Sequence, residues 1–207
     1  MRAATVNFTP PRPCATLNVC SIGAHSRRDW PTTSDGGRVI ILGIDPGLAN
    51  TGWGVVEQTG SSFRCIAYGC ITTRADERTP ERLATIHGEI VSVIGRYTPS
   101  QCAIENVYFA NNAKSAFATG QARGVALLAT AGAELELGEY SPVQIKSTVT
   151  GSGTADKKQI QYMVRTILSL PHDPKPDHAA DALAAAICHA NMRGGVAAAA
   201  ARAEAAS

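Results

Sequence analysis

The chain has 207 residues, of which 44% are hydrophobic, so it is long enough for one domain, at most two, with a core that needs no disulfides. Nineteen Lys and Arg residues against 17 Asp and Glu residues give a formal net charge of +2. This balance does not argue for nucleic-acid binding, so any basic patch has to come from folding, and the longest apolar runs are too short or too rich in alanine to span a membrane.

Residues 1–38 form the first distinct segment of the chain. They are rich in Pro, Ser, Thr and Arg, and they carry five Arg against two Asp, whereas residues 39–193 carry 13 basic and 14 acidic residues. This composition predicts a disordered N-terminal extension. A transit peptide has a similar composition. However, Val39 begins the first predicted strand and a valine codon can serve as a bacterial start, which favours a mis-assigned start or plain disorder.

Strand and helix patterns alternate regularly over residues 39–193, which we interpret as one domain. Apolar periodicity predicts strands at 39–45, 51–58, 63–73, 101–107 and 135–140. Helices are predicted from Thr79, as N-cap, to Tyr97, then over 112–133, and in two or three segments up to about Arg193. This order predicts an α/β protein in which an antiparallel meander joins parallel strands, with helices on both faces.

Two other features of the sequence bear on its setting. Residues 194–207 are Gly-Gly followed by an Ala-rich run, which predicts a flexible tail or a frayed helix. None of the cysteines forms a CxxC pair, which indicates a reducing, cytosolic compartment and no zinc site. The six cysteines are Cys14, Cys20, Cys65, Cys70, Cys102 and Cys188.

Acidic residues interrupt three apolar segments. Asp45 ends the most apolar strand, in ILGIDPG, and Glu105 lies inside the strand AIENV. His178 and Asp181 lie three residues apart in DHAADALAAAICHA, so they share one face of a helix that Asp177 is expected to cap.

Each of these residues alone has an ordinary explanation, as a turn residue, a solvent-facing residue or an acid at a helix N-terminus. Together they indicate a site, because the first and fourth strands can be neighbours in a parallel sheet, where ligands gather at the carboxyl ends of the strands. A pocket of carboxylates with one imidazole suits Mg²⁺ or Mn²⁺, and the metal would offset the cost of desolvating the charges.

Four long segments resemble the RuvC family of crossover (Holliday) junction endodeoxyribonucleases. They are ILGIDPGLANTGWGVVE, AIENVYFANNAKSAFATGQARGVAL, YSPVQIKSTVTGSGTADKKQIQYMVRTILSL and DHAADALAAAICHA, and the likeness runs from about residue 39 to 193. The resemblance implies a ribonuclease H-like fold with a five-stranded mixed sheet flanked by helices. It also implies a homodimer that uses Mg²⁺ to make paired nicks in four-way junction DNA during recombination and repair, alongside the branch-migration motor of RuvA and RuvB.

The resemblance also assigns catalytic and metal-binding roles by position. Asp45 and Glu105 match the first two family carboxylates and Asp181 matches the last. His178 stands where some members have Asp and others His, which changes the charge of the site. The implied reaction is two-metal hydrolysis with two ions about 4 Å apart, in which Asp45 bridges both ions and His178 is a neutral ligand or a proton carrier.

Three further positions match family residues that contact DNA. Tyr108 matches an aromatic residue, often Phe, that stacks on a base near the crossover. Lys146 and Lys157 match basic residues that approach the DNA backbone. Without the resemblance, Tyr108 is more often a core or rim aromatic residue, and Lys146 is as often a solvated lysine on a helix.

A stripe of small residues lies along the long helix predicted at 112–133. Ala116, Gly120 and Gly124 follow one another at four-residue spacing. Each glycine costs about 1 kcal/mol relative to alanine in a helix interior, so close packing of another backbone is expected. That backbone belongs either to this chain's own sheet or to a second subunit, and the two-fold symmetry of a four-way junction favours the second subunit.

Three alternatives compete with a junction nuclease. GIDPGLANTG also resembles the phosphate loop of actin-like and sugar-kinase-like ATPases, but those proteins need two such domains and the 155 residues from 39 to 193 are too few. A non-catalytic junction-binding protein has no need of the complete acidic set. A nuclease acting on RNA–DNA hybrids is the third and weakest alternative.

Overall fold

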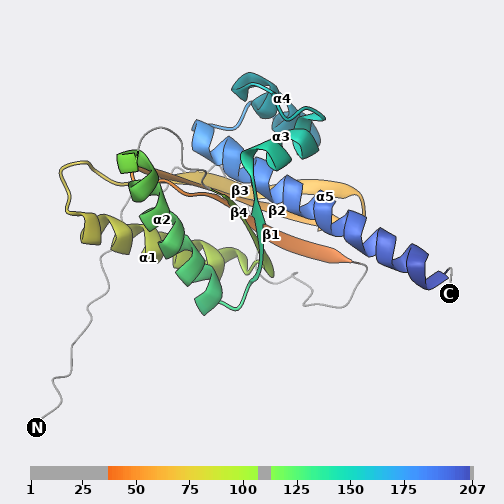
Figure 1. The fold of residues 1–207 in the computed structure, drawn as a ribbon, viewed down its shortest axis with the longest axis horizontal. Coiled ribbons are helices and arrows are strands. Elements are labelled where there is room, and N and C mark those ends of the chain that lie inside the picture. The colour runs from red at the N-terminus through yellow and green to blue at the C-terminus, as the bar shows by residue number, and fades with distance from the viewer. Residues whose placement is uncertain (1–36, 107–112, 206–207) are drawn as a thin grey trace, which may run out of the picture.

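The computed structural model describes residues 37–106 and 113–205. Their centre is a five-stranded sheet with the strand order β3-β2-β1-β4-β5 (Figure 1). Neighbouring strands β1, β2 and β3 are antiparallel, whereas β4 runs parallel to both β1 and β5. The predicted meander joined to parallel strands is therefore confirmed. The strands are β1 (Arg38–Asp45), β2 (Asn50–Thr59), β3 (Ser62–Thr72), β4 (Gln101–Glu105) and β5 (Glu136–Tyr140).

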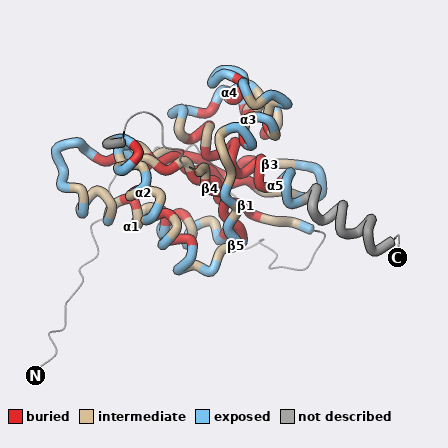
Figure 2. Tube along the Cα trace, viewed as in Figure 1, coloured by how far each residue is buried: buried red, intermediate tan, exposed pale blue. Residues whose placement is uncertain are grey.

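Helices cover both faces of the sheet, as the sequence predicts. One hydrophobic cluster packs α1 and α2 against one face, and a second packs α3, α4 and α5 against the other. Buried residues are concentrated in the sheet and in α5 (Figure 2). The helices are α1 (Thr79–Tyr97), α2 (Ala113–Gly132), α3 (Pro142–Thr150), α4 (Lys157–Ile167) and α5 (Asp177–Ala205).

Two helix ends differ from the sequence prediction in detail. The N-cap of α1 is Arg78, one residue before the predicted Thr79, and its side chain makes no capping hydrogen bond. Pro80, which fits the first turn because it lacks an N–H, accounts for the start of the helix. At the other end of the chain, α5 continues to Ala205, so most of the Ala-rich tail has a helical backbone.

Alternation along the strands decides which side chains face α5. In β1, Ile41 packs in the cluster with α5, whereas Leu42 and Ile44 pack in the cluster with α1 and α2. In β4, Ala103 faces α5 and its neighbours face the other way. Because side chains alternate with a period of two, Asp45 and Glu105 both project toward α5 from the carboxyl ends of their strands.

Glycines in β1 and β2 let α5 lie unusually close to the sheet. A Cβ atom built on Gly43 would lie 1.9 Å from the carbonyl oxygen of Ala182, and one on Gly52 would lie 1.9 Å from that of His178. Both distances are far inside van der Waals contact, so no larger residue fits without moving the helix. The close approach fixes the height and register of α5 above the strand that ends in Asp45.

No helix in the described part of the chain is both long enough and apolar enough to cross a bilayer.

Candidate active site

Asp45 and His178 meet where β1 ends beneath the first turn of α5. The Oδ2 atom of Asp45 and the Nδ1 atom of His178 are 2.7 Å apart. The Asp45 side chain is 17% exposed and the His178 side chain 42% exposed, so the pair lies at the edge of the core and is open to solvent. This hydrogen bond raises the pKa of His178 above its usual value, although partial burial opposes the shift.

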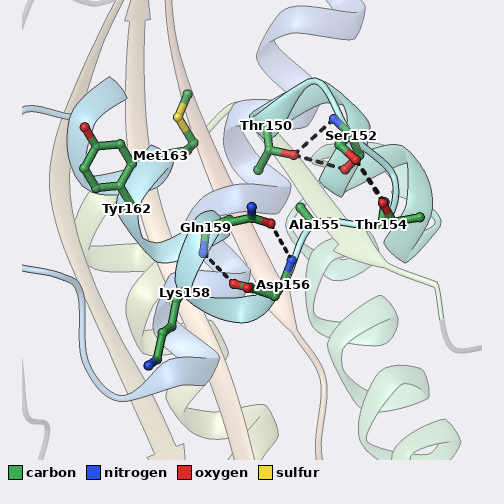
Figure 3. Close-up of a pocket in the computed structure, with 9 residues that line it drawn as sticks. All are labelled: Thr150, Ser152, Thr154, Ala155, Asp156, Lys158, Gln159, Tyr162 and Met163. Atoms are coloured by element: carbon green, nitrogen blue, oxygen red, sulfur yellow. Dashed lines mark hydrogen bonds between the residues drawn. The ribbon is translucent and has the colours of Figure 1, made fainter.

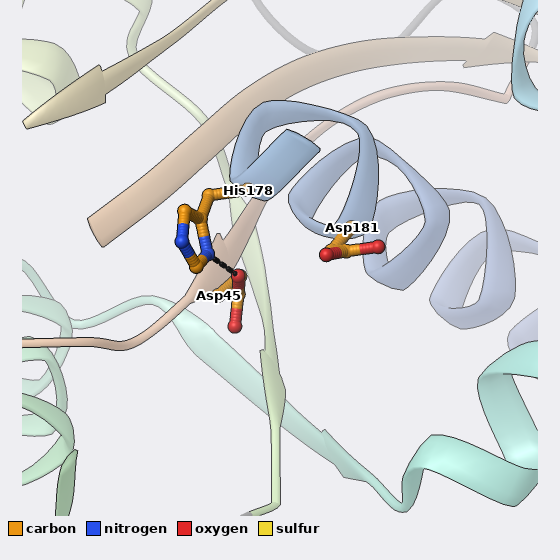
Figure 4. A group of neighbouring side chains, drawn as sticks. All are labelled: Asp45, His178 and Asp181. Atoms are coloured by element: carbon orange, nitrogen blue, oxygen red, sulfur yellow. Dashed lines mark hydrogen bonds and ion pairs between the residues drawn. The ribbon is translucent and has the colours of Figure 1, made fainter. Parts of the chain in front are cut away.

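Asp181 completes a compact group with these two residues. One ligand atom from each of Asp45, His178 and Asp181 lies within 4.8 Å of the other two (Figure 4). His178 and Asp181 are three positions apart, so they lie on the same face of α5. That face is the one directed toward the end of β1 (Figure 4). The structure thus brings together three of the four residues predicted for the site, from opposite ends of the domain.

Glu105 lies beside this group and its carboxylate falls outside the 4.8 Å set. The parallel register that pairs Ile44 with Ile104 places Glu105 next to Asp45 at the same edge of the sheet. Burial, reinforced by the negative charges of Asp45 and Asp181, raises the pKa of Glu105 to about 7. The carboxylates of Asp45 and Asp181 are thus close enough for their negative charges to disfavour ionisation of Glu105.

The pKa of Asp181 is also raised, to about 6, by burial and then by the charge of Asp45, while Lys157 and His178 oppose the shift. Glu105 and Asp181, whose ionised forms are disfavoured by burial and by nearby negative charge, gain most from a bound cation. Mg²⁺ and Mn²⁺ prefer such oxygen ligands, and a single imidazole is compatible with them. The residues present therefore fit a divalent metal site.

Lysines approach the same site from α3 and α4. Lys157 Nζ lies 3.1 Å from Asp177 Oδ2 and 3.8 Å from Asp181 Oδ2. Together with Lys146, Lys157 lines a cavity of about 290 Å³ that also includes Glu105 and Asp181. Both predicted DNA-contacting lysines thus lie at the acidic site, whereas Tyr108 lies outside the described residues.

A larger cavity of about 610 Å³ lies between α3 and α4 (Figure 3). Its lone acid, Asp156, accepts a hydrogen bond from the backbone N–H of Gln159 as the N-cap of α4. The neighbouring hydroxyl groups of Ser152 and Thr154 bond to each other. The smaller cavity, with its grouped carboxylates, is therefore the better candidate for catalysis.

The sequence analysis missed several residues that position the site. Gly43 and Gly52 admit α5, and a glycine inside an apolar strand is a signal for such close approach. Arg123 on α2 hydrogen-bonds Asn106, the residue that follows Glu105. Nothing in the sequence pattern marks Arg123, because an arginine on an amphipathic helix is ordinary.

The chain is similar to known proteins over most of its length. The profile of the family described as "Crossover junction endodeoxyribonuclease RuvC" matches residues 41–189. The chain is 51% identical over 152 residues to the curated protein of that name from Desulforamulus reducens, covering 73% of this chain and 93% of the relative. It is 52% identical over 153 residues to the one from Alkaliphilus oremlandii, covering 74% and 93%.

A solved structure supports the same relationship. The chain superimposes on Thermus thermophilus RuvC in complex with a Holliday junction substrate with a TM-score of 0.70 and 35% sequence identity, covering 73% of this chain and 93% of that chain. The five-stranded mixed sheet with flanking helices is common to both, which confirms the predicted fold class.

Proposed function

Because the chain belongs to the RuvC family of crossover junction endodeoxyribonucleases, we propose that its acidic site makes paired nicks in opposed strands of a four-way DNA junction. The protein is an endonuclease that hydrolyses phosphodiester bonds and resolves Holliday junctions in recombination and repair. The observation that carries the location of the site is the convergence of Asp45, His178 and Asp181 within 4.8 Å.

We assign metal binding to Asp45, Glu105, His178 and Asp181. Two bound Mg²⁺ ions, which Mn²⁺ can replace, would supply activation of the attacking water and stabilisation of the leaving 3′ oxygen. In this assignment Asp45 would be shared by both ions, and Glu105 and Asp181 would each help to hold one of them. All three carboxylates must be ionised to bind, so the raised pKa values of Glu105 and Asp181 make metal binding compete with protons.

His178 and the two lysines complete the proposed mechanism. His178 is either a neutral ligand or a proton carrier, and its 2.7 Å hydrogen bond to Asp45, a proposed metal ligand, supports both roles. Lys146 favours the negative charge that develops on the phosphate in the transition state. Lys157 and Lys146 contact the DNA backbone, and Tyr108 stacks on a base near the crossover, which is worth about 1–3 kcal/mol.

We also propose that the protein is a homodimer that uses one face of α2. Among the described residues, a Cβ atom on Gly120 or Gly124 would meet nothing within 4 Å, so these two glycines do not pack on this chain's own sheet, whereas Ala116 is buried. Phe117 and Leu128 lie along the same face and are 70% and 64% exposed. An exposed apolar stripe with a flat centre is suited to close packing against the same stripe of a second copy.

The dimer proposal predicts that Gly120→Leu weakens self-association while the monomer stays folded. The leucine side chain blocks close approach of a second helix but meets open space in the monomer. Light scattering gives the mass, and circular dichroism checks the fold. Gly88→Leu is the matched control, because Gly88 also lies in a helix with open space around it. A dimer mass for Gly120→Leu would reject this interface.

The setting of the enzyme is proposed on the family resemblance. Cooperation with the branch-migration motor of RuvA and RuvB fits a nuclease that needs a mobile junction. The described cysteines are thiols and not disulfides, which supports the proposal of a reducing compartment, the cytoplasm.

The decisive test is cleavage of a synthetic four-way junction and of matched linear duplex and RNA–DNA hybrid, each with Mg²⁺ and with EDTA. Paired nicks in the junction alone, lost in EDTA, are expected. Binding of the junction without nicking would point to a non-catalytic binding protein, and preferential cleavage of the hybrid would point to a different ribonuclease H-like enzyme.

A further inference from the structure

Arg123 on α2 reaches across to the carboxyl ends of β4 and β5. Its Nη2 atom donates a hydrogen bond of 2.9 Å to Asn106 Oδ1 and forms an ion pair with Glu139. The Arg123 side chain is 23% exposed, so it is mostly covered by the elements that it connects. One guanidinium thus ties a helix to the ends of two parallel strands.

The two partners of Arg123 flank the end of β4. Asn106 is the first residue after Glu105, where the strand stops, and its backbone N–H donates to the carbonyl of Tyr140 in β5 at 2.7 Å. Glu139 is the sheet partner of Ile104, the residue before Glu105. The contacts of Arg123 therefore enclose the position of Glu105 from both sides along the chain.

Burying the Arg123 guanidinium leaves one of its N–H donors without a partner among the described residues. The Nε atom of Arg123 is buried and has no hydrogen-bond partner among the described residues. A buried, unpaired donor costs about 1–3 kcal/mol, so the contacts at Nη2 must outweigh that cost to keep the side chain in place. Hydrogen bonds made by a charged donor are strong enough to do so.

We propose that Arg123 is a positioning residue for the metal site, which fixes the carboxylate of Glu105 by clamping Asn106 and Glu139. The proposal rests on the role of Glu105 as a metal ligand. β4 has five residues and ends at Glu105, so the direction in which this side chain projects depends on what holds the strand end. Removing a residue that orients a metal ligand without touching the metal typically lowers metal affinity or activity by about 10–100-fold.

The first measurement is Mn²⁺ binding to the DNA-free protein by isothermal titration calorimetry. Arg123→Ala should raise the Mn²⁺ dissociation constant by about tenfold or more. Arg123→Lys should restore part of the affinity, since one ammonium group can donate to both partners as Nη2 does. Arg64→Ala is the matched control. It also removes an arginine paired with a glutamate, Glu57, but at the other end of the sheet, so metal affinity should be unchanged.

A second set of variants separates this inference from the proposed function. Glu105→Gln should weaken Mn²⁺ binding, and unchanged binding by that variant would remove Glu105 from the metal site. If Glu105→Gln loses affinity while folded Arg123→Ala binds Mn²⁺ like the wild type, the positioning role alone is rejected. The double variant Asn106→Ala with Arg123→Ala should lose less Mn²⁺-binding free energy than the two single variants lose together, because both changes break the same contact. Full additivity would overturn the clamp.

Discussion

Asp45 illustrates how one residue can be costly for folding and necessary for chemistry. It ends a strand whose preceding four residues are buried, and its carboxylate lies 2.7 Å from Nδ1 of His178. The proximity of the two side chains is a result of the fold, whereas their role as ligands stays a prediction.

The first prediction concerns Asp45→Asn. The amide keeps the shape of the side chain but removes the charge that would hold the metals, so junction cleavage should be lost. Junction affinity should stay nearly unchanged, because DNA binding depends mainly on contacts to phosphates elsewhere. Gel-shift assays in EDTA and cleavage assays in Mg²⁺ measure the two separately. Appreciable Mg²⁺-dependent nicking by this variant would disprove the assignment.

The second prediction concerns His178. His178→Ala should lower turnover by about 10²–10⁴-fold, the usual effect of losing an acid–base group, and His178→Asp should retain much more activity. The Asp45 hydrogen bond raises the pKa of His178, so the imidazole binds its proton up to higher pH than an aspartate would. The acid limb of the pH–rate profile should therefore move to lower pH in His178→Asp.

Cleavage rates of wild type and both variants from about pH 5 to 9 test this prediction. Equal rates for wild type and His178→Ala across that range would remove His178 from the site. Retained activity in His178→Asp would favour a ligand role over proton transfer, because an aspartate in this position is ionised at neutral pH.

At the level of elements, α5 determines the geometry of the site because two proposed ligands lie on it. Its rigid placement on Gly43 and Gly52 follows from the absence of Cβ atoms there. The helix is rich in small alanines on the side facing the sheet, including Ala182 and Ala186, which shortens the distance further. The site is therefore sensitive to any change that lifts α5.

The third prediction is that Gly43→Ala destabilises the protein and impairs cleavage together. The new methyl group would overlap the carbonyl oxygen of Ala182, so α5 has to shift and carry Asp181 away from Asp45. Overpacking of this kind costs about 1–3 kcal/mol of unfolding free energy. Urea denaturation and junction cleavage measure the two effects.

Gly88→Ala is the matched control for Gly43→Ala, because its Cβ meets nothing within 4 Å and it lies inside α1. Gly88→Ala should leave the free energy of unfolding unchanged or raise it by at most about 1 kcal/mol, and junction cleavage should be normal. A Gly43→Ala protein that is as stable and as active as Gly88→Ala would contradict the close packing of α5 against Gly43.

The elements were largely predictable from sequence, and their contacts were not. Strand periodicity identified β1, which ends in Asp45, and the apolar strand that carries Glu105, because alternation and burial are local patterns. The predicted strand ran over 101–107 with Glu105 inside it, whereas β4 ends at Glu105. The seat of α5 on Gly43 depends on the register between a helix and a strand more than 130 residues apart, which no local pattern records. The Arg123 contact to Asn106 is likewise visible only in three dimensions.

At the level of the whole molecule, the acidic site sets the pH dependence of stability without metal. The pKa of Glu105 is raised to about 7 and that of Asp181 to about 6, so the folded protein binds protons that the unfolded chain has already released. The stability contributed by Glu105 therefore falls as pH rises from 4.5 to about 7, and that contributed by Asp181 falls from 3.8 to about 6. The raised pKa of His178 also makes stability fall as pH rises. Burial lowers the pKa of His189, so the contribution of that residue to stability increases as pH rises.

The fourth prediction isolates the Glu105 contribution. In EDTA, Glu105→Gln and wild type should melt alike near pH 5. Near pH 8 the variant should be more stable by an amount on the order of 2 kcal/mol, because it no longer buries a charge. Added Mg²⁺ should stabilise the wild type more than the variant and narrow the difference. Differential scanning calorimetry at both pH values measures these changes.

Glu57→Gln serves as the control of opposite sign. Burial tends to raise the pKa of Glu57, but Arg64 and Arg38 lower it overall. The ionised Glu57 side chain therefore stabilises the fold fully above about pH 4.5, and this stabilisation is lost only at lower pH. This variant should lose similar stability at pH 5 and pH 8. A Glu105→Gln protein with the same difference from wild type at both pH values would contradict the raised pKa.

The position of α5 along the chain has a consequence for biosynthesis. Strands β1 and β4 leave the ribosome long before α5, which begins at Asp177 and brings His178 and Asp181 to the sheet. A nascent chain, or one truncated before Asp177, therefore carries the strand carboxylates but no complete metal site. It also leaves the sheet face that α5 covers open to chaperones and proteases. If these residues form the metal site as proposed, a chain truncated before Asp177 is expected to have no nuclease activity.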